Sequence, residues 1–261
     1  MNTSYKHIAP DNDINTRVTN FYSVCVDKFF KNPNKIRKWG LSLDKNTDPD
    51  GEWPGKRTTS LHNYDIQLHN ELILKVFSTY LDLRYNNVSW STAETMFQEI
   101  ETYDNDTHNR GWIHKDNEAD LAFIIYLTPN ADKNSGTSLF DITTNSFETL
   151  GAIAKKQFEK EQLFKGEKIN EKEYKERLLK HESYFTEKTR FSNIYNRMIA
   201  YDSDEYHRAN NFVTNTEKRL TLIGFIKGVE INEMPLQRVR SAERWDNNLE
   251  KRINNINQGE K

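Results

Sequence analysis

Apolar and polar positions alternate along much of this chain, which is the pattern of half-buried β-strands. The segments that show it most clearly carry β-branched and aromatic residues, and they are 21–26, 121–127, 137–140 and 218–226, with a looser alternation over 88–101. Clusters of Gly, Pro, Asp and Asn separate them, as expected of turns. The pattern predicts an α+β fold that is mainly β.

Three segments follow the helical period instead. Asn32-Pro33 predicts a capped helix start, with a short helix over 34–39 that ends at Gly40. Apolar residues recur at helical spacing over about 65–83, which predicts an amphipathic helix covering one sheet. Residues 152–190 are rich in Lys and Glu and contain a capping-box-like start at Asn170 and Glu173. We interpret them as a helical insertion, either a solvated excursion or a lid over a functional site.

Length and composition narrow the class of protein. A chain of 261 residues is expected to form one domain. We expect residues 1–87 to supply strands and helices that support the core, residues 88–228 to form the core, and residues 229–261 to form a C-terminal tail. A net charge of -2 gives no general attraction to nucleic acid. Cys25 is the single cysteine, which excludes an internal disulfide and fits a reducing, cytoplasmic setting. No signal-peptide core and no apolar run long enough to cross a membrane are present.

Candidate metal chemistry starts at His114 and Asp116. Residues two apart on a strand point to the same face, so the imidazole and the carboxylate can bind the same metal ion. The distant His207, which follows a polar turn, could complete a set of two imidazoles and one carboxylate. Such a set binds non-haem Fe(II) and leaves coordination positions open. The alternative is that His114 and Asp116 are only a polar strand edge.

A second candidate site lies on the strand 218–226. Arg219 and Thr221 share a face with apolar neighbours, and a buried arginine needs an anion to offset its desolvation. Its planar guanidinium suits a carboxylate in bidentate fashion. The alternative is pairing with a nearby Asp or Glu. On the strand 121–127, Tyr126 shares a face with Ala122 and Ile124 and could point into the same cavity. His69 is expected at a core boundary, whereas His108 and His181 lie in polar stretches and are expected to be exposed.

In their order along the chain, these pieces resemble the 2-oxoglutarate and Fe(II)-dependent dioxygenases, most closely the prolyl-hydroxylase-like branch. The resemblance covers about residues 88–228, and its motifs are His114-x-Asp116, 125–128, 135–140, 197–207 and Arg219-x-Thr221. A weaker likeness at 26–33 and 53–57 is to phage and bacterial members. The resemblance implies a double-stranded β-helix, or jelly roll, whose interior can hold a small ligand.

The resemblance also implies roles for the residues. His114, Asp116 and His207 would bind iron and form the catalytic site. Arg219, with Tyr126 and Thr221, would hold the distal carboxylate of 2-oxoglutarate. A carboxylate at position 116 implies hydroxylation and not halogenation. Ascorbate is expected to support activity as an added reductant.

The substrate expected from the resemblance is a small molecule, peptide or protein with an amino-acid side chain to hydroxylate, such as proline. The reaction would release succinate and carbon dioxide in the cytoplasm of a bacterium or a phage-infected cell. Two alternatives remain open. One is a nucleobase-modifying oxygenase, which the net charge and the lack of a basic-aromatic stripe disfavour. The other is a non-catalytic jelly-roll binding or particle protein.

Overall fold

Two antiparallel sheets form the centre of the molecule. The computed structural model describes residues 21–116, 119–143, 157–213 and 218–232. The larger sheet has the strand order β1-β9-β6-β11-β5-β3-β2, the smaller has the order β10-β7-β8, and β4 and β12 form a separate ribbon. The larger sheet consists of β1 (Val24–Val26), β2 (Asn46–Thr47), β3 (Lys56–Arg57), β5 (Thr92–Ile100), β6 (Leu121–Tyr126), β9 (Met198–Asp202) and β11 (Arg219–Lys227). The remaining strands are β4 (Val88–Ser89), β7 (Thr137–Ile142), β8 (Phe185–Phe191), β10 (Tyr206–Ala209) and β12 (Glu230–Ile231).

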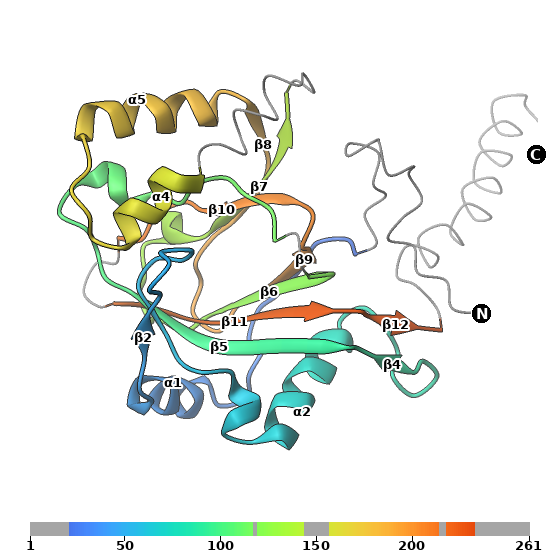
Figure 1. Ribbon diagram of the computed structural model, residues 1–261. Coiled ribbons are helices and arrows are strands. Elements are labelled where there is room, and N and C mark those ends of the chain that lie inside the picture. The colour runs from blue at the N-terminus through green and yellow to red at the C-terminus, as the bar shows by residue number, and fades with distance from the viewer. Residues whose placement is uncertain (1–20, 117–118, 144–156, 214–217, 233–261) are drawn as a thin grey trace, which may run out of the picture.

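The chain passes repeatedly between the two sheets. After β5 it reaches an isolated bridge at His114 beside β10, returns to β6, crosses to β7 and β8, and then runs through β9, β10 and β11 in alternate sheets. Figure 1 shows the smaller sheet facing the larger one. This is the double-stranded β-helix arrangement, and the expected α+β, mainly β fold class is confirmed.

β11 lies at the centre of the larger sheet and separates its two faces. It pairs with β5 along its whole length and with β6 over most of it. Leu220 and Leu222 point to the main hydrophobic core, whereas Arg219, Thr221 and Phe225 border a pocket on the opposite face. Because both of its edges are hydrogen-bonded, the pocket residues stand on a rigid element.

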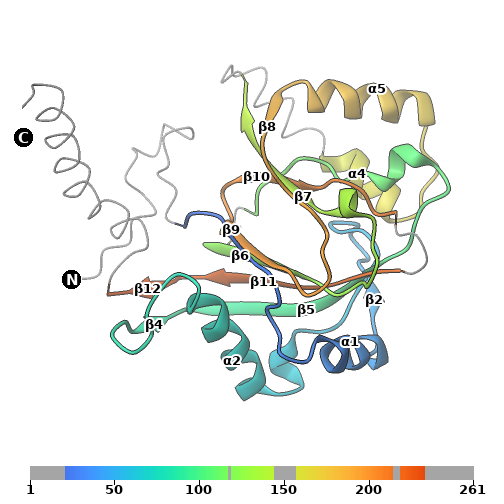
Figure 2. The same ribbon diagram turned by 180° about the vertical axis from the view of Figure 1, so that it is seen from behind.

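Two helices cover the outer face of the larger sheet, as Figures 1 and 2 show. They are α1 (Pro33–Ser42) and α2 (Ile66–Phe77). α2 buries Ile73, Val76 and Phe77 against the sheet, so the predicted amphipathic helix is confirmed, although it ends six residues early. The predicted cap at Asn32 is also confirmed, because its side chain accepts a hydrogen bond from the Lys35 N–H.

The predicted end of α1 at Gly40 is wrong. The helix continues to Ser42, and Gly40 is buried within it. A Cβ at this position would lie 2.5 Å from Cδ1 of Phe97 on β5. Glycine is therefore present to let the helix approach the sheet closely and not to end the helix.

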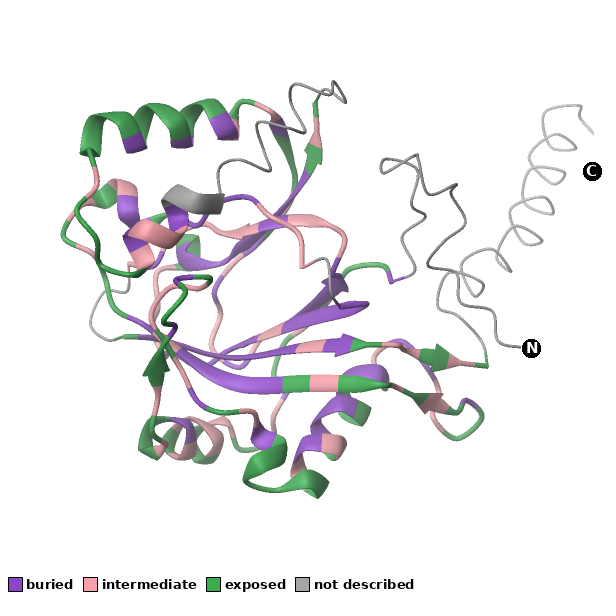
Figure 3. Cartoon of the chain, viewed as in Figure 1, coloured by how far each residue is buried: buried purple, intermediate pink, exposed green. Residues whose placement is uncertain are grey.

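The helical insertion is shorter than predicted and is packed against the sheets. It contains α4 (Gln157–Phe164) and α5 (Glu171–Glu182), but 185–190 belong to β8, which pairs with β7. Tyr174 and Leu178 of α5 are buried against Trp112. Nε1 of Trp112 donates a hydrogen bond to the Tyr174 hydroxyl at 2.8 Å. Figure 3 shows the buried positions of α5 on the side that faces the sheets.

Burial under this insertion also explains two wrong expectations. His108 and His181 are buried, not exposed. Nε2 of His181 lies 2.9 Å from the Ile113 carbonyl oxygen, and Nε2 of His108 lies 2.9 Å from a Glu171 carboxylate oxygen. The sequence around each histidine is polar, but the contacts that bury them come from distant segments. The predicted tail lies outside the described residues from position 233 onward.

The packing of α5 leads to a stability prediction. Leu178 is 2% exposed and Leu179 is 51% exposed. Leu178→Ala should lower the free energy of unfolding by about 2–5 kcal/mol, since it leaves a cavity beside Trp112. Leu179→Ala should change it by less than about 0.5 kcal/mol. Urea unfolding of both variants makes the comparison, and equal effects would mean that α5 is not docked as described.

Candidate metal centre

The backbone brings His114 and His207 together across a single antiparallel bridge. The His114 N–H donates to the His207 carbonyl at 3.0 Å, and the His207 N–H donates to the His114 carbonyl at 2.9 Å. Asp116 follows two residues later, and its N–H donates to the Ser203 carbonyl at 2.9 Å. Three backbone contacts therefore fix the positions from which the three side chains project.

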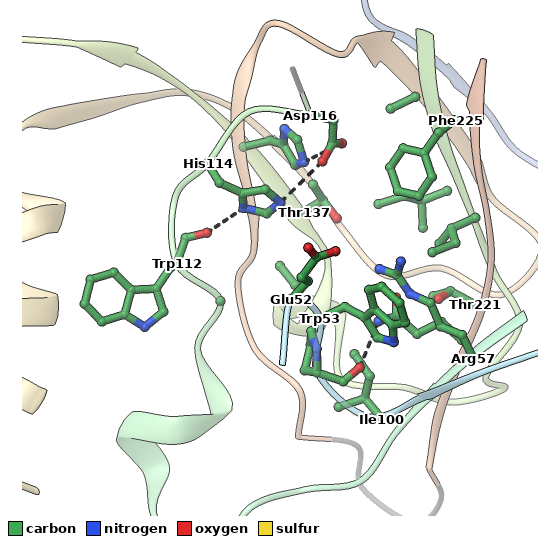
Figure 4. Close-up of a pocket in the computed structure, with 18 of the residues that line it drawn as sticks. Glu52, Trp53, Arg57, Ile100, Trp112, His114, Asp116, Thr137, Thr221 and Phe225 are labelled. Atoms are coloured by element: carbon green, nitrogen blue, oxygen red, sulfur yellow. Dashed lines mark hydrogen bonds and ion pairs between the residues drawn. The ribbon is translucent and has the colours of Figure 1, made fainter. Parts of the chain in front are cut away.

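The three side chains converge on one point. Nε2 of His207 lies 3.2 Å from Oδ2 of Asp116, and Nε2 of His114 lies 3.7 Å from Oδ1. One possible ligand atom from each residue lies within 4.8 Å of the others. Figure 4 shows the His114 imidazole beside the Asp116 carboxylate at one side of the pocket.

Backbone carbonyls orient both imidazoles. Nδ1 of His114 lies 2.8 Å from the Trp112 carbonyl oxygen, and Nδ1 of His207 lies 2.9 Å from the Glu205 carbonyl oxygen. A carbonyl only accepts, so each Nδ1 carries a proton and each Nε2 faces the carboxylate. Metal-binding histidines use this arrangement because the second nitrogen then fixes the ring and its tautomer.

Burial and neighbouring charges set the ionisation of the three groups. Burial and the charge of His207 lower the pKa of His114 to about 3, so this imidazole is neutral at neutral pH. Burial opposes ionisation of Asp116, but His207 outweighs it and lowers the pKa of the carboxyl to about 2. The His114 ring retains 42% exposure, which faces the pocket that it borders. A neutral imidazole and an ionised carboxylate are the states that bind a cation.

Arg219 and Thr221 border the same pocket from β11. Arg219 is 2% exposed, and its Nε donates to the Ser135 carbonyl at 3.3 Å. Its Nη2 and the Thr221 hydroxyl are buried and have no hydrogen-bond partner among the described residues. Among the described residues, Arg219 forms no ion pair with an Asp or a Glu, which was the alternative expectation. A buried cation without a counter-ion needs an anion from outside the chain.

Tyr126 lies behind the pocket wall and does not border the cavity. Its hydroxyl donates to Oγ1 of Thr137 at 2.9 Å, and Thr137 borders the pocket. Burial raises the pKa of Tyr126 to about 12, and the Arg219 guanidinium carbon lies 5.8 Å from its ring centroid. The contacts of Tyr126 therefore position Thr137 and Arg219.

The pocket has a volume of about 310 Å³ and contains residues that the sequence analysis did not single out. Trp53 and Arg57 belong to the segment 53–57, which could line the mouth of the site or be a simple turn, and both residues border the pocket. Lys160 and Phe164 reach the pocket from α4. Trp112 borders the pocket, but its ring points away from His114 and Asp116 and packs against α5 (Figure 4). No pattern in the sequence of α4 distinguishes Lys160 from its many charged neighbours.

The donor set fits a divalent transition metal, and the opposite wall fits a carboxylate. Two imidazoles and one carboxylate suit Fe(II) and leave open positions for other ligands. Although burial opposes it, Asp116 raises the pKa of His207, so a metal would displace the proton that the carboxylate favours on this imidazole. The unpartnered Nη2 of Arg219 and hydroxyl of Thr221 are buried hydrogen-bond donors of two residues that border this pocket. A dicarboxylate could therefore meet both ends of the pocket.

The sequence matches a family model over residues 15–223, which is most of the chain. The chain belongs to this family, DUF6445, which is described as a family of unknown function. A search of curated proteins found no match. None of the described helices is long and apolar enough to cross a membrane.

Solved structures with a similar arrangement include several oxygenases. A prolyl hydroxylase from Trichoplax adhaerens, in complex with a hypoxia inducible factor peptide fragment, is 12% identical and has a TM-score of 0.40, with 83% of this chain and 86% of that chain covered. A Pseudomonas putida prolyl-4-hydroxylase is 8% identical with a TM-score of 0.41, covering 83% and 95%. HygX from Streptomyces hygroscopicus, with nickel, 2-oxoglutarate and hygromycin B bound, is 11% identical with a TM-score of 0.44, covering 78% and 82%.

Proposed function

We propose that this protein is an Fe(II)- and 2-oxoglutarate-dependent dioxygenase that hydroxylates its substrate. One observation carries the proposal. A triad with both Nε2 atoms directed at a carboxylate shares one pocket with Arg219, a buried cation that has no counter-ion among the described residues. The triad supplies a metal site with open positions, and the arginine supplies an anion site at the opposite wall.

Each residue has a role in this proposal. His114, Asp116 and His207 would hold Fe(II). Arg219 and Thr221 would hold the distal carboxylate of 2-oxoglutarate, and the contact of Tyr126 with Thr137 would keep that wall in place. When bound, the iron and 2-oxoglutarate supply dioxygen activation. One oxygen atom would enter a substrate C–H bond as a hydroxyl group, and the other would enter succinate as carbon dioxide leaves.

The substrate half of the proposal is an amino-acid or protein side chain, such as proline. It rests on the order and spacing of the motifs, which resemble the prolyl-hydroxylase-like branch and its phage and bacterial members. The proposal includes ascorbate as a supporting reductant and a cytoplasmic setting. A nucleobase substrate is disfavoured by the net charge of -2. A purely structural role does not account for a buried arginine kept without a counter-ion.

The test is an assay of succinate release with purified full-length protein, Fe(II), 2-oxoglutarate and ascorbate. Amino acids, peptides and nucleosides are added one at a time. We expect slow succinate release without substrate and a several-fold increase with an amino-acid-containing compound. Omission of Fe(II) should abolish both rates. Absence of 2-oxoglutarate binding by calorimetry in the presence of Fe(II) would overturn the proposal, and stimulation by nucleosides alone would move the substrate to nucleobases.

A further inference from the structure

Two basic side chains border the metal pocket without a counter-ion. Arg57 reaches it from β3 and Lys160 from α4. Among the described residues neither side chain forms an ion pair or a side-chain hydrogen bond, and Nε of Arg57 is buried without a partner. A further lysine at the pocket, Lys115, differs because it pairs with Asp204 at 3.4 Å. Arg57 and Lys160 are therefore available to a ligand.

Aromatic side chains hold both cations in place. The Arg57 guanidinium carbon lies 4.3 Å from the Trp53 ring centroid and 5.9 Å from that of Phe225. Figure 4 shows Trp53, Arg57 and Phe225 on the side of the pocket opposite His114 and Asp116. The Lys160 ammonium lies 6.0 Å from the Phe164 centroid, and the residue is only 9% exposed. Cations stacked on aromatic rings keep their outward faces free for an anion.

The electrostatics of the pocket depend on Asp116. Burial lowers the pKa of both Arg57, to about 10, and Lys160, whereas the Asp116 carboxylate acts in the opposite direction on each. Glu52 at the exposed edge of the pocket also favours their charged forms. A divalent cation bound at Asp116 would neutralise that carboxylate. Arg57 and Lys160 would then lose the strongest of the carboxylate influences that favour their charged forms, while Asp48, Glu94 and Glu52 still act on Arg57, and Glu161 and Glu52 on Lys160.

The two cations come from other elements than Arg219 does, namely β3 and α4 instead of β11. Arg57 lies opposite Gln98 on β5, and Gln98 lies opposite Thr221 on β11, so Arg57 is two strands away from β11. The two backbones are therefore roughly 10 Å apart, although the Arg57 guanidinium reaches across to Phe225 of β11. The charge of Arg57 lowers the pKa of Lys160, and the charge of Lys160 lowers the pKa of His114. The groups that act on the pKa of Arg219 are Tyr126 and Tyr201 instead. A small dicarboxylate has only two charged ends, and the metal and Arg219 would take both, so Arg57 and Lys160 are left for a second anion.

We propose that Arg57 and Lys160 bind an anionic group of the substrate, a carboxylate or a phosphate, and so hold the substrate beside the metal centre. This inference rests on the proposed function for the identity of the neighbouring site. The apolar surface of Trp53, Ile223 and Phe225 borders the same space and would contact the uncharged part of the substrate. The substrate would therefore be a small anionic compound, or the end or a modified side chain of a peptide.

The experiment measures binding without turnover. Full-length protein with Fe(II) and 2-oxoglutarate is titrated anaerobically in a calorimeter with paired probes. The pairs are amino acids and their carboxamides, and phosphate monoesters and the corresponding alcohols. We expect binding of a charged member and much weaker binding of its uncharged partner. Arg57→Gln and Lys160→Gln should each weaken that binding roughly 10- to 150-fold, which corresponds to one charge-assisted hydrogen bond.

Matched controls separate this site from general charge effects. Lys56 is exposed and precedes Arg57 on β3, so its side chain points to the opposite face, and Lys165 is exposed just beyond α4. Lys56→Gln and Lys165→Gln should leave probe affinity within about twofold, as expected of screened surface charges. Thermal unfolding of every variant checks that Arg57→Gln and Lys160→Gln remain folded.

The outcomes are distinguishable from failure of the proposed function. If Fe(II) or 2-oxoglutarate does not bind, the proposed function is wrong, and anion binding that depends on Arg57 and Lys160 in metal-free protein would still support this site. The inference is overturned if 2-oxoglutarate binds but no anionic probe binds more tightly than its uncharged partner. It is also overturned if neither variant weakens binding of the anionic probe. A third contrary result would be that Arg57→Gln weakens the binding of 2-oxoglutarate as strongly as Arg219→Lys does.

Discussion

His207→Ala should yield a folded protein that no longer retains Fe(II) and releases no succinate. The variant removes one of three converging ligand atoms, and the remaining His114 and Asp116 leave the metal bound by only two side chains. Changing even an outer contact of a metal ligand typically costs about 10- to 100-fold in affinity or activity, so loss of a ligand should exceed this. Iron content after anaerobic loading and desalting, together with succinate release, gives the measurement.

A matched histidine variant provides the control for this prediction. His62 is exposed, and its ring contacts Ser60 and His69 away from the pocket. His62→Ala should keep full iron content and full activity. If His207→Ala also retained one equivalent of iron and normal turnover, the three residues would not be the metal ligands. The ligand assignment would then have to be abandoned.

Arg219→Lys should weaken 2-oxoglutarate binding while leaving Fe(II) content unchanged. Lysine keeps the charge but lacks the planar pair of donors that matches a carboxylate. Loss of one charge-assisted hydrogen bond corresponds to about 1.5–3 kcal/mol, or roughly a 10- to 150-fold rise in the dissociation constant. Calorimetry in the presence of Fe(II) measures it. An unchanged dissociation constant would show that the distal carboxylate lies elsewhere.

Arg219→Met extends this test to stability. In the described residues Arg219 has no counter-ion, and burial lowers its pKa, so the folded protein without ligand holds an unfavourable charge. An apolar side chain of similar length should therefore raise the melting temperature of the ligand-free protein while abolishing 2-oxoglutarate binding. Lower stability together with normal binding would mean that Arg219 serves the fold and not a ligand.

Local patterns in the sequence predicted much of the architecture. Alternation identified β6, β7 and β11, and the same periodicity separated Leu220 and Leu222 from Arg219 and Thr221. The two-residue spacing of His114 and Asp116 placed both on one side of an extended segment. His207 is only a candidate third ligand from its own surroundings, and the resemblance assigns it, since nothing local connects the two segments. The structure brings all three together, and their roles remain predictions.

Other features depend on contacts between distant segments. Lys160 has the same local surroundings as many exposed lysines, and only the packing of α4 directs it into the pocket. His108 and His181 are buried because α5 and its contacts cover them, which the polar local sequence does not indicate. Gly40 matched the pattern of a helix end, but its role depends on Phe97 of a different element. Local periodicity reports which face is apolar, not what covers it.

The single bridge between His114 and His207 has a consequence for how this fold resists opening. The segment with His114 joins the smaller sheet through isolated backbone contacts and not through a continuous ladder of hydrogen bonds. A cation held by both imidazoles would act as a reversible cross-link between two segments far apart in the sequence, and it would favour the closed form by mass action. Protein without metal would therefore open more readily than metal-loaded protein.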